Sequence, residues 1–460
     1  MDGTKDKMRT MPVNKLMLSM GIPMILSMML QAVYNIVDSA FVSNMKVNGE
    51  AALNALSLAF PLQVLLIAFG IGTGVGANAL LSKSLGQQDR EKAGMAAGNA
   101  LFVTAVIYIT VLIFSFTGVE AYIGSQTENP LIAQMASDYL RICCMFSFGS
   151  LFFAIYEKVL QAAGHSLYST IAQISGAVVN IILDPIFIYG IGPVPECGVK
   201  GAAYATVIGQ IVSFVTALIF HLKINKAVPN GMKYIKPNLG IIKEIYAIGL
   251  PAVIAQALMS VMTYALNIIL VNISEAMVTA YGLFYKIQQF ILFAAFGLRD
   301  AITPVISFSH GMGSRSRIND GIKYGLIYTA VITLIGTVLI EALAVPLSAV
   351  FGLSGETQSI CIDAMHIISI SFVFAGINIA FQGVFQALDS GLESLIVSVC
   401  RQFIFVIPVA WGFSKLALSD SSLSWTVWTT FIIAEVLSDI ISVVLFRRAY
   451  NRKVEVLAEE

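Results

Sequence analysis

Apolar residues fill long stretches with little or no charge, separated by short segments rich in Gly, Pro, Asn, Ser and charged residues. Several approach the length of about 20 residues that a helix needs to cross a bilayer. The pattern predicts an all-α membrane protein with twelve transmembrane helices. We place them near residues 14–42, 51–80, 94–116, 132–160, 166–192, 198–222, 241–271, 277–306, 321–344, 358–388, 391–414 and 422–446.

The composition supports a membrane protein and excludes other classes. Of the 460 residues, 57% are hydrophobic and 12% are charged, against about 25% charged in soluble domains. This excludes a soluble enzyme and a disordered chain. Lys and Arg together balance Asp and Glu at 27 each, so no net charge attracts nucleic acid.

Basic residues are distributed unevenly between the connections. One set of surfaces, which includes both termini, carries 20 of them, and the other carries 3. The positive-inside rule therefore predicts that both termini are cytoplasmic, in a multi-pass protein of the cell membrane. The other four basic residues lie within spans.

The two halves of the chain resemble each other. GIPMILSMML at 21–30 matches GLPAVIAQAL at 249–258, and VLQA at 159–162 matches VFQA at 384–387. Because each half holds six spans, the repeats are parallel and related by an axis along the membrane normal. We predict an N-terminal lobe at 1–222, a cytoplasmic linker at 223–240 and a C-terminal lobe at 241–460, an organisation that suits alternating access.

Polar residues inside two spans of the first half are candidates for an ion site. Gln31, Asn35 and Asp38 share one helix face, and Asn180 and Asp184 share another. An intramembrane carboxylate costs at least about 2.5–3.5 kcal/mol on insertion scales, so each is a functional candidate. These oxygen ligands suit Na⁺, or a carboxylate that carries a proton. The alternative is an interhelical hydrogen-bond network.

The repeat makes this cluster one-sided. Asp184 corresponds to Val409 in the second half, and Asp38 corresponds to Leu266. A purely structural polar cluster could lie in either half. The asymmetry therefore favours one ion or proton site in the first half.

Other polar residues of the first half have less clear roles. Tyr139 and Glu157 are five helical turns apart and so on one face of a straight helix, which would place both in a substrate cavity. Glu157 could instead form a surface pair with its neighbour Lys158. Asp138 and Arg141 are predicted to pair near the outer end of their span.

Charged residues in the second half leave two readings open. Arg299 and Asp300 are adjacent and are not expected to share a helix face, whereas Glu435 and Asp439 form an acidic pair one turn apart. Together with Arg401, these residues could line a cavity or neutralise one another.

Pro23 and Pro251 occupy matching places early in the first span of each half. A proline inside a helix removes a backbone hydrogen bond and permits a kink. The two prolines are therefore candidate hinges, with a static structural bend as the alternative.

Five segments resemble the multidrug and toxic compound extrusion (MATE) family of secondary transporters, and the resemblance covers about the whole chain. They are GIPMILSMMLQAVYNIVDSAFVS at 21–43, SLGQQDREKAG at 84–94, YLRI at 139–142, QAAGHS at 161–166 and NIILDPIFIYGIGPVPECGVKGAAYAT at 180–206. The resemblance implies two six-helix lobes in a V shape around a central cleft. It also implies a non-enzymatic, monomeric exporter of cationic or amphipathic drugs, with Na⁺ or H⁺ as coupling ion and no other cofactor or metal.

Within the family the chain looks closest to the bacterial DinF-like and drug-resistance branches. Their cation site, carried over by motif, would use Asp38, Asn180, Asp184 and Thr206, with Tyr139 lining the same cavity. The chain departs from another branch, which has an acidic residue in span seven, and this departure puts a second-lobe cation site in doubt.

Two other classes of function are weighed. A lipid-linked oligosaccharide flippase of the wider superfamily often has fourteen spans and a strongly cationic cleft, whereas this chain has twelve spans and four basic residues within them. An intramembrane enzyme has little support, since the sequence contains no HExxH metal motif.

Overall fold

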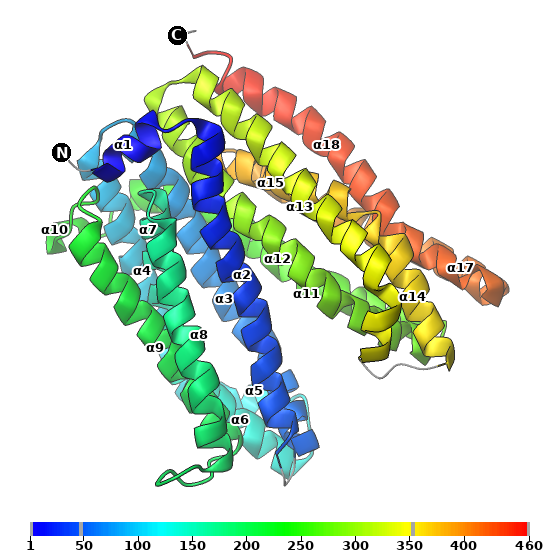
Figure 1. Cartoon of the computed structure of the whole chain (residues 1–460). Helices are drawn as coiled ribbons and strands as arrows, with labels where there is room; N and C mark the ends of the chain where they lie inside the picture. Colours follow the sequence, from blue (N-terminus) through cyan, green and yellow to red (C-terminus); the bar gives the residue numbers. More distant parts are fainter. Residues whose placement is uncertain (1–2, 46–48, 351–354, 458–460) are drawn as a thin grey trace. The chain divides into compact units, whose positions relative to one another are not determined.

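The computed structural model describes residues 3–45, 49–350 and 355–457, with side chains at positions 3–6, 35, 36, 39, 43, 50, 53 and 350 left undescribed. All regular elements within these ranges are helices, and none is a strand (Figure 1). The first half contains α1 (Gly3–Thr10), α2 (Val13–Ser43), α3 (Gly49–Gly86), α4 (Arg90–Thr117), α5 (Val119–Gly124), α6 (Pro130–Met145), α7 (Phe148–Ala162), α8 (Ser166–Tyr189) and α9 (Val199–Ile224).

The second half follows a short connecting helix, α10 (Met232–Ile235). It contains α11 (Leu239–Val271), α12 (Glu275–Met312), α13 (Arg315–Val350), α14 (Gly355–Ser369), α15 (Phe372–Ala387), α16 (Gly391–Val399), the π-helical turn η1 (Cys400–Ile404), α17 (Val406–Ser419), the 3₁₀ helix η2 (Ser421–Trp428) and α18 (Thr429–Lys453). The short helices α1, α5 and α10 are additions to the predicted spans.

The described residues contain ten helices long and apolar enough to cross a membrane, and up to twelve spans if each of two bent helix pairs counts as one. This agrees with the twelve spans predicted from the hydrophobic pattern. The bent pairs are α6 with α7, at 45°, and α14 with α15, at 51°. The spans predicted at 132–160 and 358–388 are therefore each formed by two helices with a bend between them.

Side-chain hydroxyl groups explain how both breaks are tolerated within the membrane. Tyr108 on α4 donates a hydrogen bond to the carbonyl of Met145 (3.0 Å), at the end of α6. Thr337 on α13 donates to the carbonyl of Ser369 (2.8 Å), at the end of α14. Irregular backbone at membrane depth needs such protein partners because no water is available there.

Equivalent hydrogen bonds in the two halves support the internal repeat. Ser82 on α3 donates to the carbonyl of Ala162 (3.4 Å), and Ser307 on α12 donates to the carbonyl of Ala387 (3.2 Å). In both halves the partners are 80 residues apart, and the two bonds are related by the offset of 225 seen in the sequence. The repeat is therefore preserved at the level of individual contacts.

The chain forms two compact units, and neither is continuous in sequence. Unit 1 comprises Met1–Met11 and Leu26–Val253, and unit 2 comprises Pro12–Ile25 and Ile254–Glu460. The divisions inside α2 and α11 each come two residues after a proline, Pro23 and Pro251. The lobe boundary predicted within 223–240 differs from this division and stays a prediction.

In unit 1, glycines set the close approach of α8 and α9. A Cβ atom on Gly176 would lie 1.9 Å from Ser213 Oγ and 2.3 Å from the carbonyl oxygen of Gly209. No other residue fits at this crossing. The two helices therefore run in close contact, which brings the polar residues farther along α8 toward α9.

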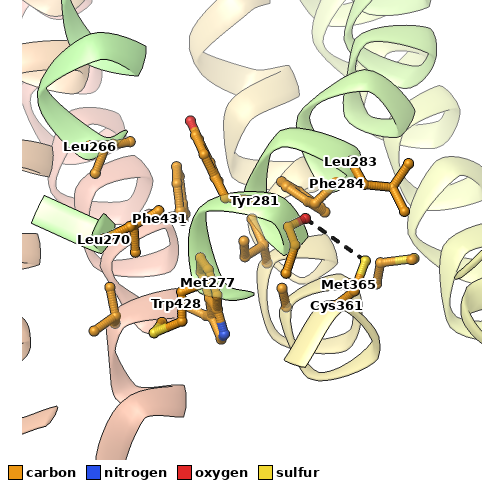
Figure 2. Packing of buried hydrophobic residues seen from close by; sticks show 14 of the residues in the cluster. Leu266, Leu270, Met277, Tyr281, Leu283, Phe284, Cys361, Met365, Trp428 and Phe431 are labelled. Carbon is orange, nitrogen blue, oxygen red and sulfur yellow. Dashed lines mark hydrogen bonds between the residues drawn. The ribbon is translucent and has the colours of Figure 1, made fainter. Parts of the chain in front are cut away.

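In unit 2, an aromatic core joins α12 to η2 and α18 (Figure 2). The ring of Tyr281 stacks on those of Phe431 and Trp428, with centroid distances of 6.0 Å and 6.5 Å. Cys361 on α14 donates to the carbonyl of Ala280 (3.8 Å), the contact drawn in Figure 2. These large buried side chains hold α12, η2 and α18 together in unit 2.

Candidate cation site

Helix α8 supplies two of the predicted site residues. Asn180 Nδ2 donates to Asp184 Oδ1 at 3.4 Å, one helical turn away, as the spacing predicts. Asn180 is 2% exposed and Asp184 is fully buried. Among the described residues, neither Asn180 Oδ1 nor Asp184 Oδ2 has a hydrogen-bond partner. Two oxygen acceptors therefore remain available inside unit 1.

Helices α2 and α9 add two more oxygen atoms. Asp38 on α2 is buried and interacts electrostatically with Asp184, so the two carboxyl groups are close. Within the part of the chain that the structure describes, neither Asp38 Oδ1 nor Thr206 Oγ1, on α9, has a hydrogen-bond partner. Unsatisfied buried polar atoms are rare and require an explanation such as an absent ion or proton. Each of the four residues that the family resemblance assigns to the cation site carries one such unsatisfied atom.

An aromatic and polar group borders these oxygens. Gln63 Nε2 donates to Tyr139 OH (3.3 Å) and to Cys143 Sγ (3.5 Å). Tyr139 interacts electrostatically with Asp38, which places it beside the carboxylates. Tyr34 lies beside Thr206 and within electrostatic range of both acids. Tyr34 was not predicted, although its position four residues before Asp38 puts it on the same face of α2.

Two further predicted residues, Gln31 and Asn35, also lie on α2, and the structure describes the side chain of Gln31 alone. Gln31 Oε1 accepts a hydrogen bond from Gln173 Nε2 on α8 (3.3 Å), and Gln173 also accepts one from Ser27. This network joins α2 to α8 about two turns from Asp38. The side chain of Asn35 lies outside the described residues.

The structure separates Glu157 from Tyr139. The break between α6 and α7 lies between these residues, so the same-face prediction, which assumed a straight helix, was wrong. Glu157 Oε1 accepts from Gln161 Nε2 (3.1 Å), and Lys158 Nζ donates to Gln161 Oε1 (3.0 Å). Both charged residues are buried, which also excludes the alternative of a surface pair.

The predicted pair of Asp138 and Arg141 was also wrong. Arg141 pairs with Glu120 on α5 (2.6 Å), and Asp138 pairs with Lys200 at the start of α9 (3.1 Å). These partners lie on other helices. Spacing along one helix could not predict them.

In the second half, four of the charged residues form two ion pairs, while Asp439 Oδ1 is buried without a hydrogen-bond partner among the described residues. Arg299 pairs with its neighbour Asp300 (2.9 Å), because its long side chain folds back along α12. This pair agrees with the alternative in which these residues neutralise one another. Arg401 on η1 pairs with Glu435 on α18 (2.6 Å), and Asn378 donates to the other carboxylate oxygen (2.9 Å).

The sequence reading missed one intramembrane pair in unit 2. Glu341 on α13 accepts from Ser369 Oγ on α14 (2.7 Å) and lies 2.5 Å from His366 Nδ1. An acidic residue and a histidine inside predicted spans were the available signal, because such residues are rare at membrane depth.

The donor chemistry at Asp38, Asn180, Asp184 and Thr206 fits a hard monovalent cation or a proton. Two carboxylates, an amide and a hydroxyl are oxygen ligands of the kind that hard cations prefer. Among the described residues, no group of three or more His, Cys, Asp or Glu side chains could hold a metal ion.

Fold and site together define a multi-pass helical membrane protein built from two related halves, with buried unpartnered oxygens in the first. The MatE family model matches residues 23–186 and 251–411, and the chain belongs to this family. Each half matches separately, as the repeat predicts, and the MATE resemblance of the sequence is confirmed.

Named relatives are transport proteins. The multidrug export protein MepA of Staphylococcus aureus (strain NCTC 8325 / PS 47) is 28% identical over 435 residues, covering 92% of this chain and 91% of that protein. MepA of Staphylococcus haemolyticus (strain JCSC1435) is 25% identical, covering 95% and 94%. The outward-facing structure of a multidrug resistance MATE family transporter of the MOP superfamily superposes with a TM-score of 0.91 at 24% identity, covering 98% of each chain. This likeness shows that the fold is that of MATE transporters.

Proposed function

We propose that this chain exports small organic cations or amphipathic drugs from the cell by antiport with Na⁺ or H⁺. The observation that carries the proposal is the set of four buried, unpartnered oxygens on α2, α8 and α9. The curated relatives are multidrug export proteins and are matched over nearly their whole length, which supports the same class of substrate.

Charge balance explains how this site couples to transport. Asp38 and Asp184 repel each other when both are ionised, because each is buried and the charge of one acts on the other. A bound Na⁺ or proton removes that repulsion and satisfies the open oxygen atoms. Occupancy therefore changes the relative free energies of conformations that pack these helices differently.

Two further elements belong to the proposed mechanism. Tyr139 and Gln31 contribute to the substrate cavity, supported by the position of Tyr139 beside Asp38. Glu157, which accepts a hydrogen bond from Gln161, stays a proposed residue of this cavity. Pro23 and Pro251 act as hinges, supported by the division of α2 and α11 just after each proline.

The proposed setting is a monomer in the cell membrane with both termini in the cytoplasm, as the distribution of basic residues supports. No cofactor other than the coupling ion is included, and the chain performs no covalent chemistry in this scheme. The relatives named above are export proteins, which supports a transporter without covalent chemistry.

The test replaces Asp184 by Asn in proteoliposomes loaded with ethidium and driven by a Na⁺ gradient or a pH gradient alone. We expect Asp184→Asn to lose ion-driven efflux, and wild-type protein to respond to one of the two gradients. Asp138→Asn is the matched control, since it makes the same change in a surface ion pair with Lys200. Full ion-driven efflux by Asp184→Asn would refute the assignment of the site.

A further inference from the structure

Helix α18 and the π-helical turn η1 carry a second group of buried oxygen atoms, in unit 2. Among the described residues, Gln402 Oε1, Ser438 Oγ and Asp439 Oδ1 have no hydrogen-bond partner. Gln402 is 5% exposed and Ser438 is fully buried. A buried polar atom without a partner requires an explanation, such as an ion that binds there.

The ion pair of Arg401 and Glu435 joins η1 to α18 beside these atoms, with Arg401 Nε 2.6 Å from Glu435 Oε1. Gln402 follows Arg401 directly in the chain. Ser438 and Asp439 come three and four residues after Glu435, about one helical turn away. Both members of the ion pair also interact electrostatically with Asp439. The three oxygens therefore belong to one part of unit 2.

The charges of this group do not cancel. Arg401 neutralises Glu435, whose second carboxylate oxygen accepts a hydrogen bond from Asn378 Nδ2 (2.9 Å). With Asp439 ionised, one positive and two negative side chains give a net charge of −1. A buried charge needs a partner or a bound ion. One monovalent cation at Asp439 brings the sum to zero, whereas a divalent cation would leave a positive charge.

The internal repeat shows that helix packing does not require this charged group. At the offset of 225, Asp439 corresponds to Phe214. Arg401 corresponds to Gly176, the glycine at the close crossing of α8 and α9. The first half therefore forms the equivalent crossing without these charges, and packing alone does not explain them in the second half.

The backbone and the depth of the group also fit an ion site. Phe405 N–H donates to the carbonyl of Cys400 (2.9 Å), the bond of a π turn, and such turns are frequent at functional sites. Asp439 is 14 residues from the end of the span Ser421–Lys453, or about 21 Å along the helix. It is half-buried, and carboxylates at this depth face the bundle interior or a water-filled cavity.

A cation satisfies more of these oxygens than a proton does. A proton on Asp439 makes one hydrogen bond, so it satisfies at most two of the three atoms, the oxygen that carries it and its acceptor. A hard cation can contact all three, because carboxylate, amide and hydroxyl oxygens are the ligands that it prefers.

We propose that Asp439, Gln402 and Ser438 bind a monovalent cation in unit 2, with the Asp439 carboxylate as the charged ligand. This site is separate from the oxygens on α2, α8 and α9, and it uses the last two spans instead of α11. It goes beyond the proposed function, since it holds whether the site in unit 1 takes Na⁺ or H⁺.

The test measures saturable binding of radioactive Na⁺ to purified full-length protein in detergent at about pH 8, where carboxylates in water are ionised. The background is Asp38→Asn/Asp184→Asn, which removes both carboxylates of the site in unit 1. We expect this background to bind Na⁺. Adding Asp439→Asn should weaken binding at least about tenfold, as expected for the loss of one nearby charge. Adding Glu393→Gln, the matched change in the pair with the exposed Arg452, should leave binding unchanged.

Two further measurements separate ion binding from a structural role. Na⁺ should raise the Tm of the background and not that of the background with Asp439→Asn, because a ligand of the native state stabilises it. Gln402→Leu keeps the charge of the group and removes one oxygen. It should weaken Na⁺ binding about two- to tenfold, the effect of one polar contact.

Na⁺ binding that is absent from the folded background, or unchanged by Asp439→Asn, would overturn the inference. If the background does not fold, the single variant decides, since Asp439→Asn should lose one saturable Na⁺ per chain relative to wild type. Failure of the proposed function is a separate outcome. If Asp184→Asn keeps full ion-driven efflux while Asp439→Asn loses Na⁺ binding, the assignment in unit 1 fails and the site in unit 2 stands.

Discussion

The buried ion pair of Arg401 and Glu435 allows a quantitative test of the packing in unit 2. The two side chains are each 11% exposed and meet at 2.6 Å, while Asn378 donates to the second carboxylate oxygen at 2.9 Å. Arg401→Met keeps the side-chain volume but leaves Glu435 with an unpaired buried charge. Removing one partner of such a pair costs about 3–5 kcal/mol.

The loss is measured as a melting temperature, followed by the fluorescence of the chain's tryptophans during heating in detergent. With about 2–4 °C per kcal/mol for a unit of this size, we expect Arg401→Met to lower Tm by about 6–20 °C. The double variant Arg401→Met/Glu435→Gln removes the stranded charge and should recover most of the loss. Lys92→Met, which breaks a surface pair with Glu244, should cost no more than about 1 kcal/mol.

The comparison between the single and double variants tests whether Arg401 stabilises unit 2 by compensating the charge of Glu435. If the pair stabilises unit 2 by charge compensation, the double variant melts well above Arg401→Met. Equal melting temperatures for the two would show that Arg401 acts through packing alone, and the argument from a stranded carboxylate would be refuted.

Three other predictions address packing and the surface. Gly176→Ala should lower both Tm and ion-driven efflux because its Cβ would lie 1.9 Å from Ser213 Oγ, whereas Gly412→Ala, with no atom within 4 Å, should leave both unchanged or raise Tm. Gly98→Ala should loosen the packing of α10 on α4, since its Cβ would lie 2.2 Å from the carbonyl oxygen of Tyr234, and faster tryptic cleavage near α10 would show it. Hydrogen bonds from Ser422 lower the pKa of Asp420 from 3.8, so this stabilisation is present above that value and is lost as pH falls through the lowered pKa. Ser422→Ala should raise the Asp420 midpoint in a carboxyl NMR titration, and an unchanged midpoint would contradict the assignment.

Periodicity and composition predicted the helical spans well because both depend on local sequence. Long apolar stretches determine which segments cross the bilayer, and the twelve predicted spans match the helices and bent pairs that the structure describes. The pairing of Asn180 with Asp184 was equally predictable, since one helical turn separates them. The repeat could be recognised because matching segments recur at a nearly constant offset, and equivalent hydrogen bonds in the two halves agree with it.

Partners between helices could not be predicted from spacing. Arg141 pairs with Glu120 and Asp138 pairs with Lys200. These partners lie on other helices, so the pairs depend on how the helices pack and not on spacing along one helix. The break after Met145 depends on a hydroxyl from α4 and so on tertiary contact. Glu341 was overlooked because a long apolar stretch surrounds it, and its partners His366 and Ser369 lie on another helix.

The discontinuous units have a consequence for biogenesis. Residues 12–25 emerge from the ribosome long before Ile254, yet the other residues of their unit begin there. Within that unit a Cβ atom on Gly297 would meet the Ile25 backbone at 2.7 Å, so the partner surface of this segment is made more than two hundred residues later. The N-terminal part of α2 therefore lacks this partner in the membrane until α12 has been synthesised. A ribosome that stalls in the second half releases a chain with that surface uncovered, a natural target for membrane quality control.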